Sequence, residues 1–358
     1  MSLPPCRRKI LFLDQTLNGG GAERVLCTVM RGLDPEKYEI HLVIITKLGA
    51  LAHLIPDHVH VHILGIPHTR QAFFATVKAL WKIRPDIVYT TTTRTAQLVA
   101  CSGFLSPNFI LIMRFPMKPV SLIHDTSAWS IKLMRFFFRR ADYVIAQTKE
   151  MADELTHYFE IKRQHIKTIA NPVDYEQIDQ SVATAKNPFD RKKINVVASG
   201  TVYPVKGYDI LLTAFAEVVS RNDNYNLFIL GRDQDGNTEK LQALSTELSV
   251  QNHVHFLGFQ NNPYPYYKFC DLFVLSSRTE GCPNVLLEAM YFERPVVATK
   301  CVPIIGKIVE NRETGFLVEP ENPEQLRDAI LAYKQLTPKK NSKNSNEIVE
   351  FIDQLCCN

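Results

Sequence analysis

Two glutamates, Glu280 and Glu288, stand in the stretch RTEGCPNVLLEAM. An apolar run precedes this stretch, and Pro283 suits the first position of a helix. The two acids are spaced too widely for an i,i+4 pair on that helix. A carboxylate can accept two hydrogen bonds from neighbouring hydroxyls, so the pair could contact two parts of one long hydroxylated ligand. Taken alone, the spacing fits a pair of solvated surface acids equally well.

Two glycine-containing turns could hold an anion. Gly20 and Gly21 follow an apolar run and precede a helical pattern, and Lys206 precedes another helix after the run that ends at Gly200. Glycine lets the backbone approach a ligand closely, and a helix start offers free N–H groups and a partial positive charge. The spacing is not G-x-G-x-x-G, so a dinucleotide fingerprint is not indicated. A plain tight turn and a solvated lysine are the alternatives.

These residues lie in an alternation of apolar runs and amphipathic stretches. Strands are expected at 9–14, 40–46, 59–64, 86–90, 109–113, 142–147, 194–200, 225–231, 254–259, 271–277, 295–299 and 315–319. Helices are expected at 22–33, 70–83, 93–103, 149–159, 207–220, 237–249, after Pro283 and at 323–335. Runs that are apolar on both faces and separated by helices predict an α/β fold with covered parallel sheets.

The alternation pauses in a polar, proline-containing segment, so two doubly wound units in tandem are expected. The predicted divisions are an N-terminal domain at 1–178, a linker at 179–193, a C-terminal domain at 194–338, and a tail or helix at 339–358 that could cross back to the first domain. Ligands of such folds bind at the carboxyl ends of the strands. A ligand is therefore expected in a cleft between the two domains.

Charge and cysteine content restrict the class of protein. Residues 1–178 hold 22 Lys and Arg against 15 Asp and Glu (+7), and the rest holds 19 against 22 (−3). A basic first half indicates an anionic partner. The eight cysteines lack C-x-x-C spacing, which fits a reduced cytosolic protein without a zinc site. The apolar run near the N-terminus is too short for a signal peptide, and no window reaches the about 18 apolar residues of a spanning helix.

The second half resembles the retaining glycosyltransferases of GT-B architecture, glycosyltransferase family 4, almost continuously. The resemblance rests on KGYDILLTAFAEV, VHFLGFQNNPYPYY, CDLFVLSSRTEGCPNVLLEAM, RPVVAT and ETGFLVEPENPEQLRDAI. In the first half NGGGAERV, RRADYVIAQTKEMADEL and IKTIANPVD are similar to the family as well. The resemblance implies two Rossmann-like domains that face a cleft.

The resemblance also implies roles for single residues. Glu288 would bind the ribose of a nucleotide, Glu280 the hydroxyls of the transferred sugar, and Lys206 the departing diphosphate. Gly20 and Gly21 would approach the sugar phosphate from the other domain. The remaining expected donor contacts are Gly200, Thr201, Arg278, Gly281, Cys282, Asn284, Val285 and Leu286; the last three would offer free N–H groups at the helix start.

Two positions depart from the family pattern. The family usually has an arginine directly after the glycine at 200, but Thr201 stands here, and Arg278 or Arg24 could supply the missing charge. The family's usual Gly-rich segment with a Glu near 302–308 is replaced by VPIIGKIVE. These departures leave room for a degenerate protein that binds a sugar nucleotide without turnover.

The N-terminal half offers weaker candidates. Arg114 follows a strand, so it is expected near the ligand as a catalytic, donor or acceptor contact, with Lys118 beside it, and a solvated arginine fits the pattern equally well. His124 could assist proton movement, although a surface histidine is the favoured interpretation. His58, His60 and His62 alternate along a strand, which could imitate a metal trio but favours a row on a solvated face.

The stretch WSIKLMRFFFRRADY alternates aromatic and basic residues. Such a helix could lie in an anionic membrane interface or contact the acceptor, or it could bury its phenylalanines in the core. The residues expected to make that contact are Lys132, Arg135, Arg139 and Arg140.

The expected function is transfer of a hexose or N-acetylhexosamine from a nucleotide-diphosphate sugar, with a UDP-sugar favoured, to a glycan or glycolipid in surface polysaccharide or lipopolysaccharide synthesis. No metal motif is present, so the leaving phosphate would be stabilised by Lys206 and helix N-termini. The resemblance implies front-face transfer with retention. No cofactor and no nucleic-acid partner are expected; a dehydrogenase is the weak third alternative. The expected location is the cytoplasm, or the cytoplasmic face of the inner membrane.

Overall fold

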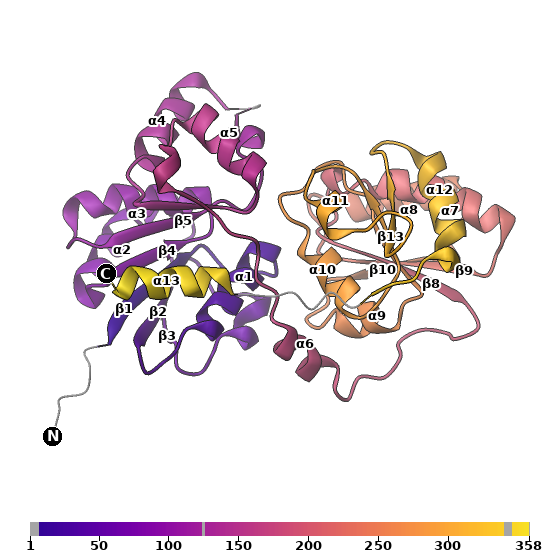
Figure 1. The fold of residues 1–358 in the computed structure, drawn as a ribbon, viewed down its shortest axis with the longest axis horizontal. Coiled ribbons are helices and arrows are strands. Elements are labelled where there is room, and N and C mark those ends of the chain that lie inside the picture. Colours follow the sequence, from indigo (N-terminus) through magenta and orange to yellow (C-terminus); the bar gives the residue numbers. More distant parts are fainter. Residues whose placement is uncertain (1–6, 124–125, 340–345, 358) are drawn as a thin grey trace. The chain divides into compact units, whose positions relative to one another are not determined.

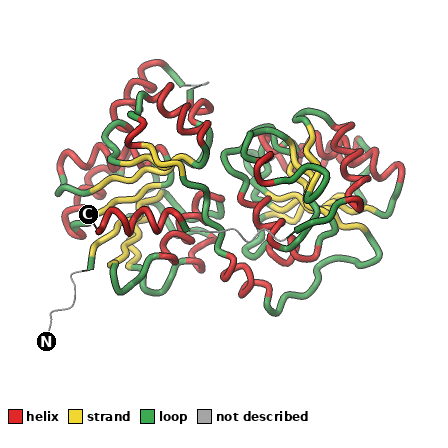
Figure 2. The backbone as a smooth tube through the Cα atoms, viewed as in Figure 1, coloured by secondary structure: helices red, strands yellow, loops and turns green. Residues whose placement is uncertain are grey.

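The chain forms two compact units, drawn as a ribbon in Figure 1 and as a tube in Figure 2. The computed structural model describes residues 7–123, 126–339 and 346–357. Unit 1 comprises Met1–Pro172 together with Asn344–Asn358, and unit 2 comprises Val173–Lys343. The division thus falls before the boundary expected at 178, and the C-terminal segment belongs to unit 1.

Unit 1 is built on a seven-stranded parallel sheet in the order β3-β2-β1-β4-β5-β6-β7. Its strands are β1 (Arg8–Asp14), β2 (Tyr38–Ile44), β3 (His60–Ile63), β4 (Ile87–Thr90), β5 (Ile110–Arg114), β6 (Tyr143–Ala146) and β7 (Ile166–Thr168). The central strands are apolar and buried on both faces, because helices cover both sides of the sheet.

The helices of unit 1 divide between the two faces of its sheet (Figure 1). One face packs against α2 (Phe73–Ile83), α3 (Thr93–Ser102), α4 (Ala128–Phe138) and α5 (Lys149–Phe159). The other face carries α1 (Gly21–Gly32) and the C-terminal helix α13 (Glu347–Cys357). The ring of Phe351 packs 5.1 Å from that of Tyr143, and the hydroxyl of Tyr38 donates to Asp353 at 2.6 Å. Helix α13 therefore completes this face.

Unit 2 repeats the design with a six-stranded parallel sheet in the order β10-β9-β8-β11-β12-β13. Its strands are β8 (Ile194–Ser199), β9 (Tyr225–Leu230), β10 (Val254–Gly258), β11 (Leu272–Leu275), β12 (Val296–Thr299) and β13 (Gly315–Val318). Its helices are α6 (Tyr175–Val182), α7 (Tyr208–Arg221), α8 (Asn237–Glu247), α9 (Tyr264–Phe269), α10 (Asn284–Tyr291), α11 (Ile305–Ile308) and α12 (Pro323–Ala332). Both units are doubly wound and Rossmann-like, which confirms the predicted α/β fold class.

Four elements escaped the sequence analysis: β7, α6, α9 and α11. Strand β7 has only three residues, Ile166–Thr168, too few to show a periodic pattern. Helix α6 runs into the start of the predicted linker, 179–193. Asp174 caps this helix, because its side chain accepts from the N–H of Gln177 at 2.9 Å. Among the described residues, no helix has the length and apolar character needed to cross a membrane.

Candidate functional site

The candidate site lies in unit 2, where strands β8 and β11 pair side by side. Strand order reverses at this pair: β9 and β10 follow on one side, β12 and β13 on the other. Loops that leave neighbouring strands at such a switch point diverge and form the usual ligand crevice of a doubly wound sheet. The loop after β8 carries Lys206 and the loop after β11 carries Glu280, so the fold brings together residues far apart in the sequence.

The two loops are fixed to each other by close backbone contact. Lys206 ends the single 3-10 turn η6 (Pro204–Lys206), and Gly207 has a φ of 62°, in the left-handed region that favours glycine. A Cβ atom at Gly207 would lie 2.2 Å from the carbonyl oxygen of Ser276. The hydroxyl of Ser276 donates to the carbonyl of Lys206 at 2.8 Å. Only glycine therefore fits between the Lys206 turn and the end of β11.

Lys206 and Glu280 form a partly buried ion pair. The ammonium Nζ of Lys206 lies 2.6 Å from Oε1 of Glu280, and the side chains are 20% and 11% exposed. The hydroxyl of Ser277 donates to the same Oε1 at 2.6 Å. The carboxylate thus neutralises the only cation that the Lys206 turn contributes. Ser277 was not predicted as a site residue, because its contact depends on the turn between positions 277 and 280.

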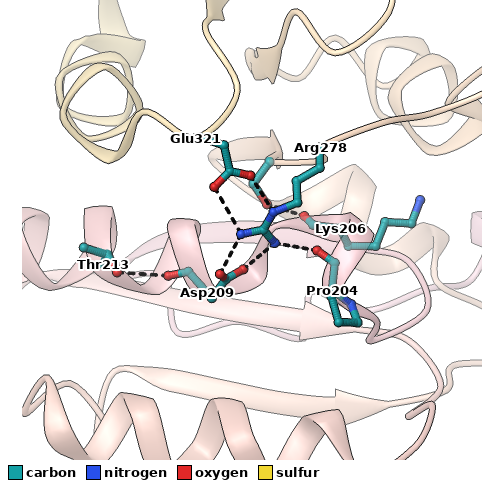
Figure 3. Close-up of polar contacts among 7 residues, drawn as sticks. Pro204, Lys206, Asp209, Thr213, Arg278 and Glu321 are labelled. Carbon is teal, nitrogen blue, oxygen red and sulfur yellow. Dashed lines mark hydrogen bonds and ion pairs between the residues drawn. The ribbon is translucent and has the colours of Figure 1, made fainter. Parts of the chain in front are cut away.

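Arg278 forms hydrogen bonds and ion pairs with neighbouring residues of unit 2, as Figure 3 shows. Its guanidinium donates to both carboxylate oxygens of Asp209, at 2.8 and 2.7 Å, and to the carbonyl of Pro204 at 2.5 Å. Its Nε also lies 2.5 Å from Oε1 of Glu321. These contacts join three segments of the unit. They give Arg278 a structural role and offer no support for its predicted use as the replacement cation on a diphosphate.

The end of β8 is closed by Tyr208, another residue that the sequence analysis missed. Its hydroxyl donates to the carbonyl of Gly200 at 3.1 Å, and burial together with the nearby charge of Glu280 raises its pKa. Thr201 is exposed, and Gly281 and Cys282 are half-buried. These four predicted donor residues, Gly200 included, lie on the same two loops as Lys206 and Glu280.

Helix α10 begins one residue later than expected, with Pro283 as its N-cap and Asn284 as its first residue. The N–H of Leu286 donates to the carbonyl of Pro283 at 3.0 Å. The prediction that Leu286 offers a free N–H group to a ligand is therefore wrong, because the first helical turn uses this group. Asn284 and Val285 do begin the helix, as expected.

Glu288 is buried, with 6% exposure, on the second turn of α10. Burial and the charge of Glu288 raise the pKa of Tyr175 to about 12, so the two side chains lie close together. The ring of Tyr175 stacks on that of Tyr291, with centroids 4.3 Å apart and planes inclined by 15°. Helix α6, absent from the prediction, thus supplies an aromatic wall beside Glu288. A solvated surface acid, the alternative interpretation, does not describe this residue.

The predicted glycine loop of unit 1 already holds an anion from the chain itself. Gly19 has a φ of 114°, and the N–H groups of Gly19 and Gly20 donate to Oε2 of Glu23 at 2.6 and 2.9 Å. Gly21 opens helix α1, and Glu23 is acidic in its first turn, where the helix dipole favours negative charge. The loop can bind an oxyanion. Contact of Gly20 and Gly21 with a donor held by unit 2 stays a prediction.

Arg114 lies in a buried polar layer at the carboxyl ends of the unit 1 strands. It is 1% exposed, and its guanidinium donates to Asn171, whose amide lies 3.4 Å from Oε1 of Gln147. In the same layer Thr91 donates to the carboxylate of Asp14, whose pKa burial raises to about 7. Arg114 therefore ties strand ends together; its predicted contact with substrate stays a prediction.

The other described candidates of unit 1 are four basic residues that line one pocket, Lys132, Arg135, Arg139 and Arg140, and Lys118, which is not among the residues that line it. Lys118 is half-buried beside a 3-10 turn, and its carbonyl accepts from Ser121. His124 lies outside the described residues. Lys132, Arg135 and Arg139 lie on or directly after α4, and Arg140 follows them.

Two of the three alternating histidines, His60 and His62, lie on β3, and both lie close to His41 of the neighbouring strand β2. Nδ1 of His41 on β2 lies 3.1 Å from Nε2 of His62, and its other ring nitrogen lies 2.9 Å from Glu39. The rings of His41 and His60 lie 5.1 Å apart. Within the described part of the chain, no group of three or more His, Cys, Asp or Glu is placed to hold a metal ion.

Comparison with known proteins identifies both halves of the chain. A family model described as "Glycosyltransferase Family 4" matches residues 19–177, and one described as "Glycosyl transferases group 1" matches residues 179–348. Together the two matches span the chain from the glycine loop to the start of α13.

Individual proteins and solved structures also resemble the chain. A 4-alpha-N-acetylgalactosaminyltransferase of Campylobacter jejuni, acting on an N-acetylgalactosamine-N,N'-diacetylbacillosaminyl-diphospho-undecaprenol, is 26% identical over 335 residues, 89% of this chain and 88% of that protein. An uncharacterized glycosyltransferase of Methanocaldococcus jannaschii is 30% identical over 174 residues, 47% of this chain but only 42% of that protein. The structure of Anabaena HepE with UDP and glucose has the same fold, with a TM-score of 0.75 at 22% identity over 98% of both chains.

Proposed function

Because the chain belongs to the family 4, or group 1, glycosyltransferases, we propose that it transfers a hexose or N-acetylhexosamine from a UDP-sugar to a glycan or lipid-linked glycan, with retention at the anomeric carbon. The observation that carries this proposal is the pair of Lys206 and Glu280 at the switch point of unit 2. A cation and a hydroxyl-binding carboxylate stand next to each other there, as a sugar joined to a diphosphate requires.

In the proposed reaction the ion pair between Lys206 and Glu280 opens, and each side chain then binds one part of the donor. The ammonium of Lys206 turns to the diphosphate, and the carboxylate of Glu280 accepts from the hydroxyls of the sugar. Breaking the bond between the sugar carbon and the phosphate oxygen places negative charge on that oxygen. A partly buried ammonium stabilises this charge more than water does.

The acceptor hydroxyl attacks the face from which the diphosphate leaves, and the departing phosphate oxygen takes the hydroxyl proton. Retention then needs no protein nucleophile. The dipole at the start of α10 adds positive potential beside the phosphates. Lys206 and this helix start supply the stabilisation that a metal would otherwise give, and no cofactor takes part beside the two substrates. Glu288, buried beside Tyr175, holds the ribose.

The choice of donor and acceptor draws on the comparisons. The structures of Anabaena HepE contain UDP or UDP-glucose, which supports a UDP-sugar. The Campylobacter relative acts on an undecaprenol-linked glycan, which supports an acceptor carried on a lipid diphosphate in surface polysaccharide synthesis. A lipid-linked acceptor would agree with a location in the cytoplasm or at the cytoplasmic face of the inner membrane.

The proposal is tested by incubating the purified protein with a panel of UDP-, GDP- and ADP-sugars and measuring nucleotide release, with and without membrane extract. Release that needs both one UDP-sugar and the extract is the expected result, and NMR of the product should show the anomeric configuration of the donor. Release with only GDP- or ADP-sugars, or an inverted product, contradicts the proposed donor or stereochemistry.

A sugar-nucleotide-binding protein without turnover is the second candidate, and Thr201 favours it. The exposed Thr201 provides no charge where the family usually has an arginine, and Arg278 is held by Asp209 and Glu321. In the same panel, binding of a UDP-sugar without nucleotide release under any acceptor condition would select this candidate. Gain of turnover in a Thr201→Arg variant would then identify the missing cation as the cause.

A further inference from the structure

Helix α4 of unit 1 exposes an apolar stripe. Trp129, Leu133 and Phe136 recur at i, i+4 and i+7, so they share one face of the helix. Trp129 is 70% exposed and Phe136 is 54% exposed, whereas Phe138 on the other side is buried in the core. The sequence left open whether the aromatic residues of this helix pack inside. The structure divides them: one face packs against the core and the other is open.

The stripe continues across neighbouring elements. Phe104, on the 3-10 turn η3 (Gly103–Leu105), stacks on Phe136 with ring centroids 6.2 Å apart and planes inclined by 9°. Trp81 of helix α2 donates its indole N–H to the carbonyl of Leu105, on the same 3-10 turn as Phe104, at 2.7 Å. Trp81, Phe104 and Leu105 are all more than half exposed. Both tryptophans of the sequence are thus exposed, Trp129 on the stripe and Trp81 beside the turn that carries Phe104.

Cations lie beside the aromatic residues. A pocket of about 520 Å³ is lined by Lys132, Arg135, Phe136, Arg139, Arg140 and Glu160. Glu160 pairs with Arg135 at 2.9 Å and with Arg139 at 3.4 Å. Lys132 and Arg140 have no ion-pair partner among the described residues, and the guanidinium of Arg140 lies 3.7 Å from the centre of the Phe104 ring. Four cations thus face one carboxylate.

We propose that this surface docks unit 1 on an anionic phospholipid bilayer. Exposed aromatic rings would enter the interface between headgroups and acyl chains, which Trp favours because it has an apolar body and a polar N–H. The unpaired charges of Lys132 and Arg140 would meet lipid phosphates, and Arg135 and Arg139 would exchange Glu160 for them. A protein partner fits less well at Lys132, because lysine is depleted in protein interfaces, whereas lipid phosphates attract Lys and Arg alike.

This inference goes beyond the proposed function, and its test needs no donor and no turnover. The two tryptophans report docking directly. In a Trp81→Phe variant the tryptophan fluorescence, excited selectively over that of tyrosine, comes from Trp129 alone. It should shift to the blue and become protected from iodide when phosphatidylglycerol vesicles are added at about 0.15 M salt. Phosphatidylcholine vesicles should give a smaller shift. High salt should weaken the binding to anionic vesicles, because the Debye length falls from about 8 Å at 0.15 M to about 3 Å at 1 M.

Vesicle sedimentation of the full chain measures the contribution of each residue. Lys132→Gln and Arg140→Gln should each weaken binding to phosphatidylglycerol vesicles about fivefold, and Trp129→Ser roughly tenfold. Lys240→Gln, a change of an exposed lysine in unit 2, is the matched control and should bind like the parent protein. Because all four side chains are exposed, thermal unfolding should be unchanged, which excludes misfolding as the cause.

Three results would overturn the inference. Trp129 fluorescence that does not respond to vesicles which do sediment the protein would place the docking surface elsewhere. Equal binding to neutral and anionic vesicles would remove the role of the cations. Competition by millimolar inorganic diphosphate, together with full binding by Trp129→Ser, would show that the pocket takes a small soluble anion and not a bilayer.

Discussion

Nζ of Lys206 lies 2.6 Å from Oε1 of Glu280, although 73 residues separate them in the chain, and the hydroxyl of Ser277 donates to the same oxygen. The two residues meet because β8 and β11 are neighbours in the sheet. The pair holds the two side chains against each other. In the proposed reaction, the donor that replaces this contact offers an anion to Lys206 and hydroxyls to Glu280, which would favour a sugar joined to phosphate.

Lys206→Ala should lower turnover about 100-fold or more, because the charge on the leaving phosphate loses its cation. Binding of the UDP-sugar should fall much less, since the charge develops fully only during bond cleavage. Steady-state kinetics and calorimetric titration with the donor separate the two effects. Lys300→Ala is the matched control: Lys300 also pairs with a glutamate in unit 2, at 2.8 Å from Glu319, but lies on the exposed surface. Equal losses in both variants would contradict the assignment.

Glu288→Gln should weaken binding of UDP roughly tenfold, because it removes the negative charge that accepts from the ribose and keeps the shape of the side chain. The same loss for UDP and for the whole UDP-sugar would locate the contact on the nucleotide. Glu293→Gln, just after α10 and exposed, should leave the affinity unchanged. Full UDP affinity in Glu288→Gln would instead make this residue a structural partner of its neighbours.

Arg278→Met should lower the free energy of unfolding by about 1 kcal/mol. Arg278 makes a bidentate pair with Asp209 and also contacts Glu321 and Pro204, so one change releases three segments (Figure 3). The partners are partly exposed, which keeps the effect small. Urea unfolding measures it, with Lys300→Met expected near zero. Unchanged stability, combined with lost donor binding, would return Arg278 to the role of a donor contact.

The His41 cluster should make stability fall as the solution becomes acidic. Burial lowers the pKa of His41, with the charges of His60 and His62 acting in the same direction and that of Glu39 opposing them. Burial also lowers the pKa of His62, and Lys82 adds to this. Below about pH 6.5, the ordinary pKa of histidine, the unfolded chain binds more protons than the folded chain. The stabilisation is complete above that pH and is lost as the pH falls through the folded pKa values.

Urea unfolding between pH 8 and pH 5 measures this dependence. Asp14 contributes with the opposite sign, because burial raises its pKa to about 7 and folding therefore favours its protonated form. The comparison with His41→Gln isolates the histidine term: the variant should lose less stability on acidification than the parent protein. A parallel pH profile for both proteins would contradict the argument.

The fold was largely predictable because parallel strands are buried on both faces and appear as continuous apolar runs. Strand β1 and helix α5 lie where the sequence places them, within one residue at each end. Strand β7 and helix α6 were not predicted, because a three-residue strand and a short helix in a polar segment are set by capping and packing and not by periodicity.

The site was predictable in its residue types but not in its contacts. The sequence named Lys206, Glu280 and Glu288 as candidates, because glycine turns and a helix start after strands are local patterns, and the family resemblance supplied their expected roles. Only the tertiary structure paired Lys206 with Glu280, engaged Arg278 with Asp209 and placed Tyr175 beside Glu288.

The physical reason is that sequence patterns report on local conformation, whereas side-chain contacts depend on residues far apart in the chain. The sequence determines local conformation, burial pattern and the chemical groups available at each strand end. Partners of a charged side chain depend on strand order, which brings β8 beside β11 and leaves the β9 loop on the other side. Helix α4 is a second example. Its aromatic and basic residues can be seen in the sequence, but the packing of the helix on its sheet decides which aromatic rings stay exposed.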